Sequence, residues 1–390
     1  MVKTKLIPKT VVESNPNLDQ AKLNRRIILS RIKRKIFKHV WLLRLTIILS
    51  VFFSCVIILF LTSNYLKKSP VYQNILLLSD FIFTPQDKIK SVGNLTNVLI
   101  LGKGGVGHDA PELTDTLIFA SVPHPNWLKT NNRENFISLV SIPRDIWVPE
   151  LRIKINSSYY WGNKKEPGGG LILAKSTAEE VVGKPIQYVI VIDFFGFKKI
   201  VDLLEGIEVE VGNSFSDDKY PISGKEEDLC GGDPEFKCRY EILRFTQGKQ
   251  VMDGDTALKF VRSRNAVGDE GTDFARVARQ QKVISAIQKK ILSRQILLSP
   301  KKLIALRDAI IESIETDIDP SEGTILIRRL FQARNNVESH VLPEEYLDIP
   351  IKSPNFDNLY VFVPKDDSWN SVHDWVDCIL KGDSNCTKAR

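Results

Sequence analysis

"QYVIVIDFFGFKKIVDLLEGIEVEV", residues 187–211, is the stretch that decides the expected fold. It begins with a run of Val and Ile, continues with apolar residues at helical spacing up to Gly206, and ends by alternating apolar with acidic residues. This order predicts a strand, a helix and a second strand. Segments of the same two kinds precede it, at 96–102, 114–122, 135–143 and 170–183. Strands interleaved with helices predict a layered α/β domain.

The pattern changes after this stretch. Residues 212–247 look like a long irregular insertion, and helical spacing returns over 299–314 and 321–337. No linker-like composition interrupts the chain near residue 295. We therefore expect residues 296–390 to complete the same domain.

Positive charge is concentrated at the N-terminus. The chain carries a net charge of +7, but residues 1–44 hold 12 Lys or Arg against two acidic residues and so account for +10. The rest of the chain sums to −3, which is not the charge of a nucleic-acid-binding body. No nucleic-acid partner is expected.

The basic segment runs into "LTIILSVFFSCVIILFL", residues 45–61, which contains no charged residue. With the apolar residues just before it, this run gives about 22 residues, enough to span a bilayer. A cleaved signal peptide is the alternative, but the basic region is long and no small-residue cleavage pattern follows. We therefore expect a cytoplasmic tail over 1–39, a single transmembrane helix over 40–62 and an extracytoplasmic stalk over 63–92. The folded domain would then lie outside the cell membrane.

Cysteine usage fits an external domain. Cys55 lies in the predicted membrane span, and the other four form two pairs, each eight positions apart: Cys230, Cys238, Cys378 and Cys386. Of the three possible connectivities, two local disulfides, Cys230–Cys238 and Cys378–Cys386, are the simplest. Zinc is the alternative, but no C-x-x-C and no His at ligand spacing supports it.

A charged helix is predicted from "GTDFARVARQQ", residues 271–281. Asp273 would cap it, and Arg276, Arg279 and Gln280 would share one face at i, i+3 and i+4. We expect apolar residues roughly on the opposite side: Val277, Ile284, Ile287 and Ile291. The charged face is either solvated or an anion site, where backbone N–H groups and guanidinium groups converge.

Other charged residues gather at the ends of predicted elements: Asp115, Arg144, Asp145, Lys154, Arg262 and Arg264. Taken singly, each could be an ordinary surface charge. Taken together, they lie where α/β domains bind ligands, and a phosphate-rich ligand would explain arginines gathered on a net-negative body. Arg262 and Arg264 would point to one face if "FVRSR" is extended.

"GKGGVGH", residues 102–108, is similar to a nucleotide-binding phosphate loop. His108 and Asp109 stand where that loop needs Lys and a hydroxyl residue, so we do not expect an NTPase.

Eight motifs follow one another in the order "NVLILG", "TDTLI", "SIPRD", "KINSSYYWG", "VDLLEGIEVEV", "MDGDTAL", "FVRSR" and "TDFARVARQQ". This series resembles the LytR–CpsA–Psr family of cell-envelope glycopolymer transferases. The resemblance covers about residues 93–295, the expected catalytic domain, and continues more weakly through 314–319. It implies a layered α/β/α domain with a central mixed sheet, preceded by one N-terminal transmembrane helix.

The resemblance implies a phosphotransferase. Such an enzyme moves a glycopolymer with its phosphate from a polyprenyl-pyrophosphate lipid onto a peptidoglycan sugar hydroxyl. Carried over by motif, the residues that would hold the pyrophosphate are Arg144, Lys154, Arg262, Arg264, Arg276 and Gln280. In the same motifs Asp145, Asp273 and Arg279 would help to bind substrate. Arginine forks and a divalent ion suit the negative charge of phosphoryl transfer.

The resemblance also implies Mg²⁺, held by Asp115. Family members commonly have a second Asp in a G-x-D pattern, but here Gly104 occupies that position. Asp109, in the same loop, would then supply the missing carboxylate. Magnesium accepts one or two carboxylates, completed by water and phosphate.

Three other functions remain open. A lipid pyrophosphatase would use the same residues, with water as the acceptor. A transcriptional attenuator is a non-enzymatic alternative, but the basic tail is short, has no helix-turn-helix pattern and adjoins the predicted membrane helix. A structural wall-binding protein would not need arginines clustered around an acidic pair.

Overall fold

The computed structural model describes residues 24–33, 41, 44–58, 84–108, 110–124, 136–225, 227–333, 336–382 and 386. The chain forms two compact units, Met1–Leu77 and Leu78–Arg390. In the first unit, the described residues are helical, and they cover residues 41 and 44–58 of the predicted membrane span. Among the described residues, no helix is both long and apolar enough to cross a bilayer. The rest of the predicted span, at 40, 42–43 and 59–62, lies outside the described residues.

The second unit is built around a six-stranded sheet with the strand order β11-β6-β1-β2-β3-β12. The strands are β1 (Leu95–Lys103), β2 (Thr114–Pro123), β3 (Ile137–Ser141), β6 (Tyr188–Asp193), β11 (Ile314–Thr316) and β12 (Val337–Val341). β1 pairs parallel with β6, β3 pairs parallel with β12, and the other neighbours are antiparallel. The predicted central mixed sheet is confirmed.

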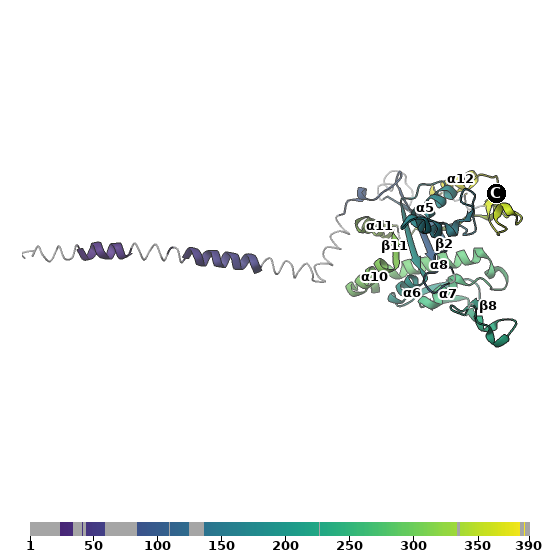
Figure 1. Cartoon of the computed structure of the whole chain (residues 1–390), viewed down its shortest axis with the longest axis horizontal. Coiled ribbons are helices and arrows are strands. Elements are labelled where there is room, and N and C mark those ends of the chain that lie inside the picture. The colour runs from purple at the N-terminus through teal and green to yellow at the C-terminus, as the bar shows by residue number, and fades with distance from the viewer. Residues whose placement is uncertain are drawn as a thin grey trace, which may run out of the picture. The chain divides into compact units, whose positions relative to one another are not determined.

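Helices cover both faces of this sheet (Figure 1). Leu99 and Leu101 of β1 join the core beneath α5 (Gly169–Val182) and α12 (Asn370–Leu380). Val98, one residue out of phase, joins the opposite core, which contains α11 (Pro320–Gln332) and receives Ile284 of α8 (Asp273–Ile291). This alternation is the period of two that a strand imposes, and it makes the domain the predicted α/β/α layers.

A third core lies beside the sheet. It joins α6 (Phe194–Leu203), α7 (Gly254–Arg262), α8 and α10 (Pro300–Ser313) to the antiparallel pair β7 (Ile207–Val211) and β10 (Gly248–Met252). α9 (Arg294–Leu297) closes it with the buried Ile296. The opening stretch 187–211 is therefore β6, α6 and β7, as predicted.

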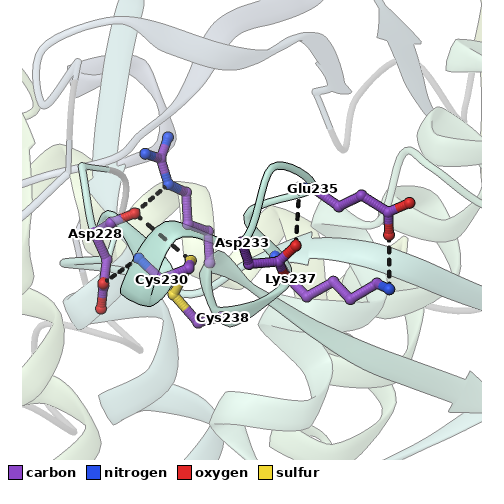
Figure 2. The surroundings of a disulfide bond; sticks show 7 residues. Asp228, Cys230, Asp233, Glu235, Lys237 and Cys238 are labelled. Atoms are coloured by element: carbon purple, nitrogen blue, oxygen red, sulfur yellow. Dashed lines mark hydrogen bonds and ion pairs between the residues drawn. A yellow bond between two sulfur atoms is a disulfide. The ribbon is translucent and has the colours of Figure 1, made fainter.

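The structure corrects the predicted insertion. Residues 212–247 are not irregular throughout, because β8 (Phe215–Pro221) and β9 (Tyr240–Phe245) pair as an antiparallel hairpin. The Cys230–Cys238 disulfide closes the loop between the two strands (Figure 2). The second predicted disulfide, Cys378–Cys386, is also present.

The domain begins earlier than the predicted boundary after residue 92. Ile89 is buried in the core beneath α11. Arg329 of α11 donates to Gln86 Oε1 at 3.1 Å and to Thr96 Oγ1 at 2.7 Å, so residues from about 84 pack onto the domain. At the other end of the chain, β11 and β12 extend the sheet on both edges.

Candidate active site

Four of the predicted site residues meet where β1, β3 and β6 end and β2 begins, and we call this end of the sheet the active edge. Because β2 runs antiparallel to β1 and β3, its first residues lie beside the last residues of those strands. Arg144 Nη1 donates to Asp115 Oδ1 at 2.5 Å, and Arg144 Nε lies 3.4 Å from Asp145 Oδ2. Lys154 Nζ donates to Asp145 Oδ1 at 2.6 Å. The result is a continuous Asp115–Arg144–Asp145–Lys154 network.

A tight hairpin brings Lys154 back to this edge. β4 (Trp147–Val148) pairs antiparallel with β5 (Ile153–Lys154), which sets Lys154 opposite Trp147. Ile146 and Ile155 are both buried, and Ile155 N donates to Ile146 O at 2.8 Å. Two buried apolar side chains thus fix the turn that carries the charged ones.

The network runs from the protein interior to solvent. The side chains of Asp145, Arg144 and Asp115 are 10%, 17% and 47% exposed, respectively. Charge-assisted bonds to Asp145 are therefore partly shielded from water, whereas Asp115 opens to solvent. An incoming anion can reach Arg144 from the side of Asp115.

Arg262 reaches the same edge from α7. Its guanidinium carbon lies 4.4 Å from the ring centre of Phe194, the residue directly after β6, and Nη1 donates to Tyr220 Oη at 3.1 Å. The ring of His108 also contacts Phe194, at 5.0 Å between centroids. Neighbouring strands lie about 4.8 Å apart, so the edge from β6 to β3 is about 14 Å wide.

The "FVRSR" motif is not extended, so the condition under which Arg262 and Arg264 would point to one face is not met. α7 ends at Arg262, so the "FVRSR" motif is a helix end followed by a loop. Arg264 lies exposed in that loop, and its backbone N–H donates to Asp217 Oδ2 at 3.0 Å. The amphipathic pattern of α7 is the signal that would have corrected the prediction.

The predicted arginine helix is α8, but its cap and its faces differ from expectation. Thr272, not Asp273, is the N-cap, and its Oγ1 accepts from Ala275 N at 3.1 Å. The side chain of Asp273 lies outside what the structure describes. Arg276 and Arg279 are both buried. They precede the buried Val283 and Ala286 by seven residues each, so the arginines share the core-facing side of the helix.

Arg279 therefore holds protein rather than substrate. Its side chain is 3% exposed, and its nitrogen atoms donate over 2.6–3.0 Å to Phe260 O, Ser263 O, Glu270 O and Glu270 Oε2. Burial lowers the pKa of Arg279, and Glu270 opposes that shift. The predicted substrate-binding role is replaced by a structural one.

Gln280 is half-buried beside these arginines. The next residue, Gln281, ties α8 to the sheet, since its Nε2 donates to His340 O at 3.0 Å and lies 3.5 Å from Ser141 Oγ. Ser141 ends β3, three residues before Arg144. The first turns of α8, with Arg276, thus lie near the active edge.

A second polar cluster was missed from the sequence. Lys103 Nζ donates to Glu112 Oε1 at 3.1 Å and to Tyr159 Oη at 3.2 Å, and Tyr159 in turn donates to Glu315 of β11. Burial opposes a charged Lys103, but the hydrogen bonds with Glu112 and Tyr159 raise its pKa overall. Burial raises the pKa of Tyr159. Lys103 lies inside "GKGGVGH", whose similarity to a nucleotide-binding loop does not point to this cluster.

Of the two acidic residues in the network, Asp115 has the more open carboxylate. It is half-exposed at the active edge, whereas both oxygen atoms of Asp145 are engaged by cations. Asp109, the other predicted ligand, lies outside the described residues. Within the described part of the chain, one trio of metal-ligating side chains converges, Asp228 with Cys230 and Cys238, and its two sulfur atoms are bonded to each other (Figure 2).

The fold and this edge define an α/β/α protein with a site of arginines and carboxylates at its strand ends. The chain belongs to the LytR_cpsA_psr family, whose model matches residues 79–375. The resemblance seen in the motifs is thereby confirmed.

Two relatives are both named TagU. The chain is 30% identical over 240 residues to the polyisoprenyl-teichoic acid–peptidoglycan teichoic acid transferase TagU of Enterococcus faecalis. That match covers 59% of this chain and 65% of the relative, just under two thirds of its length. TagU of Bacillus cereus is 26% identical over 258 residues, covering 65% of this chain and 68% of the relative.

A solved structure shares the fold. The crystal structure of Bacillus subtilis TagV matches with a TM-score of 0.50 and 21% identity, covering 75% of this chain and 99% of that one. At this identity the likeness concerns the fold alone.

Proposed function

We propose that this chain is a phosphotransferase that moves a glycopolymer, with its phosphate, from a polyprenyl-pyrophosphate lipid onto a sugar hydroxyl of peptidoglycan. The observation that carries the proposal is the Asp115–Arg144–Asp145–Lys154 network at the carboxyl edge of the sheet. The names of the TagU relatives, which join a polyisoprenyl-linked teichoic acid to peptidoglycan, support it.

The geometry suits a pyrophosphate. The planar guanidinium group of Arg144 donates to Asp115 through Nη1, and a phosphate oxygen can take the place of that carboxylate. Asp145 remains on Lys154 and keeps Arg144 oriented. Arg262, held by Phe194 and Tyr220, offers a second guanidinium from the far side of the edge.

In the proposed reaction the acceptor hydroxyl oxygen bonds to the glycan-side phosphorus, and the bond from that phosphorus to the bridging oxygen breaks. Polyprenyl phosphate leaves with the bridging oxygen, and the hydroxyl proton passes to solvent. Negative charge grows on the leaving phosphate, so guanidinium groups fixed beforehand stabilise the transition state more than water does.

We propose that Mg²⁺ binds at Asp115. Bound there, the ion would neutralise phosphate charge as a Lewis acid. The side chain needs no rearrangement of the core to accept it, because Asp115 already faces solvent.

We also propose that residues 40–62 anchor the chain in the cell membrane, with the N-terminus in the cytoplasm. The apolar run at 45–61 and the +10 segment before it support this orientation. Full-length tagged protein should remain with the membrane fraction, and protease added to wall-free cells should digest the domain but spare the tail. A shortened, secreted product would contradict the anchor.

The transfer itself can be tested with the full chain in detergent, a labelled polyprenyl-pyrophosphate-linked glycan, peptidoglycan and Mg²⁺. We expect one polyprenyl phosphate released for each glycan attached, and Asp115→Asn should require more Mg²⁺ for the same rate. Labelled glycan phosphate appearing in solution instead of on peptidoglycan would favour a pyrophosphatase. No release of polyprenyl phosphate would refute the proposal.

A further inference from the structure

One buried carboxylate holds the loop that carries Arg264. Asp217 of β8 is fully buried, at 0% exposure. Its Oδ2 accepts from Ser263 Oγ at 2.7 Å, Arg264 N at 3.0 Å and Asn265 N at 3.1 Å. Three consecutive residues directly after α7 thus bond to a single oxygen atom.

The same segment is held from the other side by Arg279. Asp217 takes hydrogen bonds from the N–H groups and the hydroxyl, whereas Arg279 donates to the carbonyl oxygen atoms of Phe260 and Ser263. At the end of α7, backbone N–H groups and carbonyl groups therefore both have side-chain partners. Backbone groups at a helix end would otherwise be left to water.

The hairpin that carries Asp217 also positions Arg262. Tyr220 lies three residues further along β8, and its hydroxyl accepts from Arg262 Nη1. Asn265 Nδ2 donates to Lys219 O at 2.9 Å, so the loop also bonds to the backbone of β8. One strand therefore contacts the side chain of the first arginine of the motif and the backbone of the second.

The placement of this carboxylate needs a reason beyond stability. The carboxyl end of a helix is the negative end of its dipole, where an acidic group is disfavoured and a cation is preferred. A buried charge is tolerated only with full hydrogen bonding. Asp217 meets that condition through its hydrogen bonds to the residues that directly follow Arg262. The free-energy cost of burying its carboxylate is therefore offset only when this segment, which carries Arg264, is held in place.

We propose that Asp217 is a positioning residue for phosphoryl transfer: it sets the direction in which Arg262 and Arg264 present their guanidinium groups to the pyrophosphate. It does not touch the substrate, because it is buried beneath the loop. This inference rests on the proposed function and adds to it a residue outside the charged cluster at the sheet edge.

The test compares Asp217→Asn with Asp218→Asn in the full chain. Asp218 is the matched control, because it undergoes the same chemical change one residue away but lies exposed, where it accepts from Ser216 Oγ. Each variant is assayed for transfer and, by calorimetry, for the dissociation constant of geranylgeranyl pyrophosphate with Mg²⁺.

We expect Asp217→Asn to lower the transfer kcat/KM roughly ten- to hundredfold, the range for losing hydrogen bonds to a buried charge. Asp218→Asn should stay within about twofold of wild type. If Asp217→Asn does not fold, Ser263→Ala removes one of the three bonds and keeps the charge, and it should raise the dissociation constant several-fold.

A double-mutant cycle separates positioning from general destabilisation. In a background with both Arg262→Ala and Arg264→Ala, Asp217→Asn (or Ser263→Ala) should weaken pyrophosphate binding much less than in wild type, because both groups that it positions are gone. Equal losses in both backgrounds, or an Asp217→Asn variant like Asp218→Asn, would overturn the positioning role while wild-type transfer stands. A wild-type chain that neither binds pyrophosphate nor transfers glycan would overturn the proposed function as well.

Discussion

Arg144 and Arg152 are eight residues apart, and their surroundings differ. The Arg144 side chain is 17% exposed and joins two carboxylates at the active edge. The Arg152 side chain is 55% exposed, and its Nη2 donates to Pro354 O at 3.0 Å and pairs with Asp357. The two arginines therefore form a matched pair, one in the proposed site and one on the surface.

We predict that Arg144→Ala lowers the transfer rate roughly a hundred- to thousandfold, the typical loss for one preorganised charge contact to a transition state. Arg152→Ala should stay within about twofold, because an exposed ion pair contributes little. The initial rate of polyprenyl phosphate release measures both, with circular dichroism as the check on folding. Equal rates for the two variants would remove Arg144 from the site.

For Arg279 we predict an effect on stability, since its side chain bonds to other parts of the protein. Arg279→Ala leaves Glu270 and two buried carbonyl groups without their partner. Breaking a buried ion pair from one side costs about 3–5 kcal/mol, so urea unfolding should show a loss of that order. Arg307→Ala, which removes a surface arginine paired with Asp308, should change stability by less than about 0.5 kcal/mol. A loss as small for Arg279→Ala would mean that its bonds do not form.

At the scale of elements, the strands rich in Val and Ile and the helices between them were predictable, whereas β11 and β12 were not. The predicted strand at 114–122 is β2, and the predicted helix at 170–183 is α5, each within a residue or two. β11 and β12 were missed because each is short and has polar residues in it. Such strands form through pairing with neighbours, not through their own pattern.

The site was predictable in part, because most of its charged residues follow or open elements that the sequence predicts. Asp115, Arg144, Asp145 and Lys154 lie at ends of regular elements, and the topology brings them together as expected. The prediction for α8 was wrong about its buried side, because it placed the apolar residues opposite the arginines, whereas Arg276 and Arg279 are buried. Buried arginines interrupt the apolar pattern by which a core face is recognised. Asp217 gave no signal, since its partners lie about 46 positions away.

The β8–β9 hairpin supplies a prediction at this scale. The Cys230–Cys238 disulfide closes a loop with a separation of eight residues, as does Cys378–Cys386. Closing such short loops contributes up to about 2–3 kcal/mol, so reduction should lower the melting temperature modestly. Thiol titration of unreduced protein should find these four cysteines blocked. Four reactive thiols in protein taken from the cell envelope would contradict the disulfides.

For the Leu78–Arg390 domain as a whole, the sheet gathers charged residues that are far apart in the chain. Asp115, Arg144 and Lys154 come from the segments around β2, β3 and β5, and Arg262 comes from α7. The body of the chain is net negative, but at this edge the three cations Arg144, Lys154 and Arg262 outnumber the carboxylates of Asp115 and Asp145, which favours an anionic ligand. The central claim is that this ligand is a pyrophosphate.

A crystal structure of the chain with polyprenyl pyrophosphate and Mg²⁺ tests that claim most directly. We predict phosphate oxygen atoms about 2.7–2.9 Å from the guanidinium groups of Arg144 and Arg262, with Asp115 beside the metal. Pyrophosphate bound at another surface, with Arg144 still paired to Asp115 and in contact with no phosphate oxygen, would contradict it.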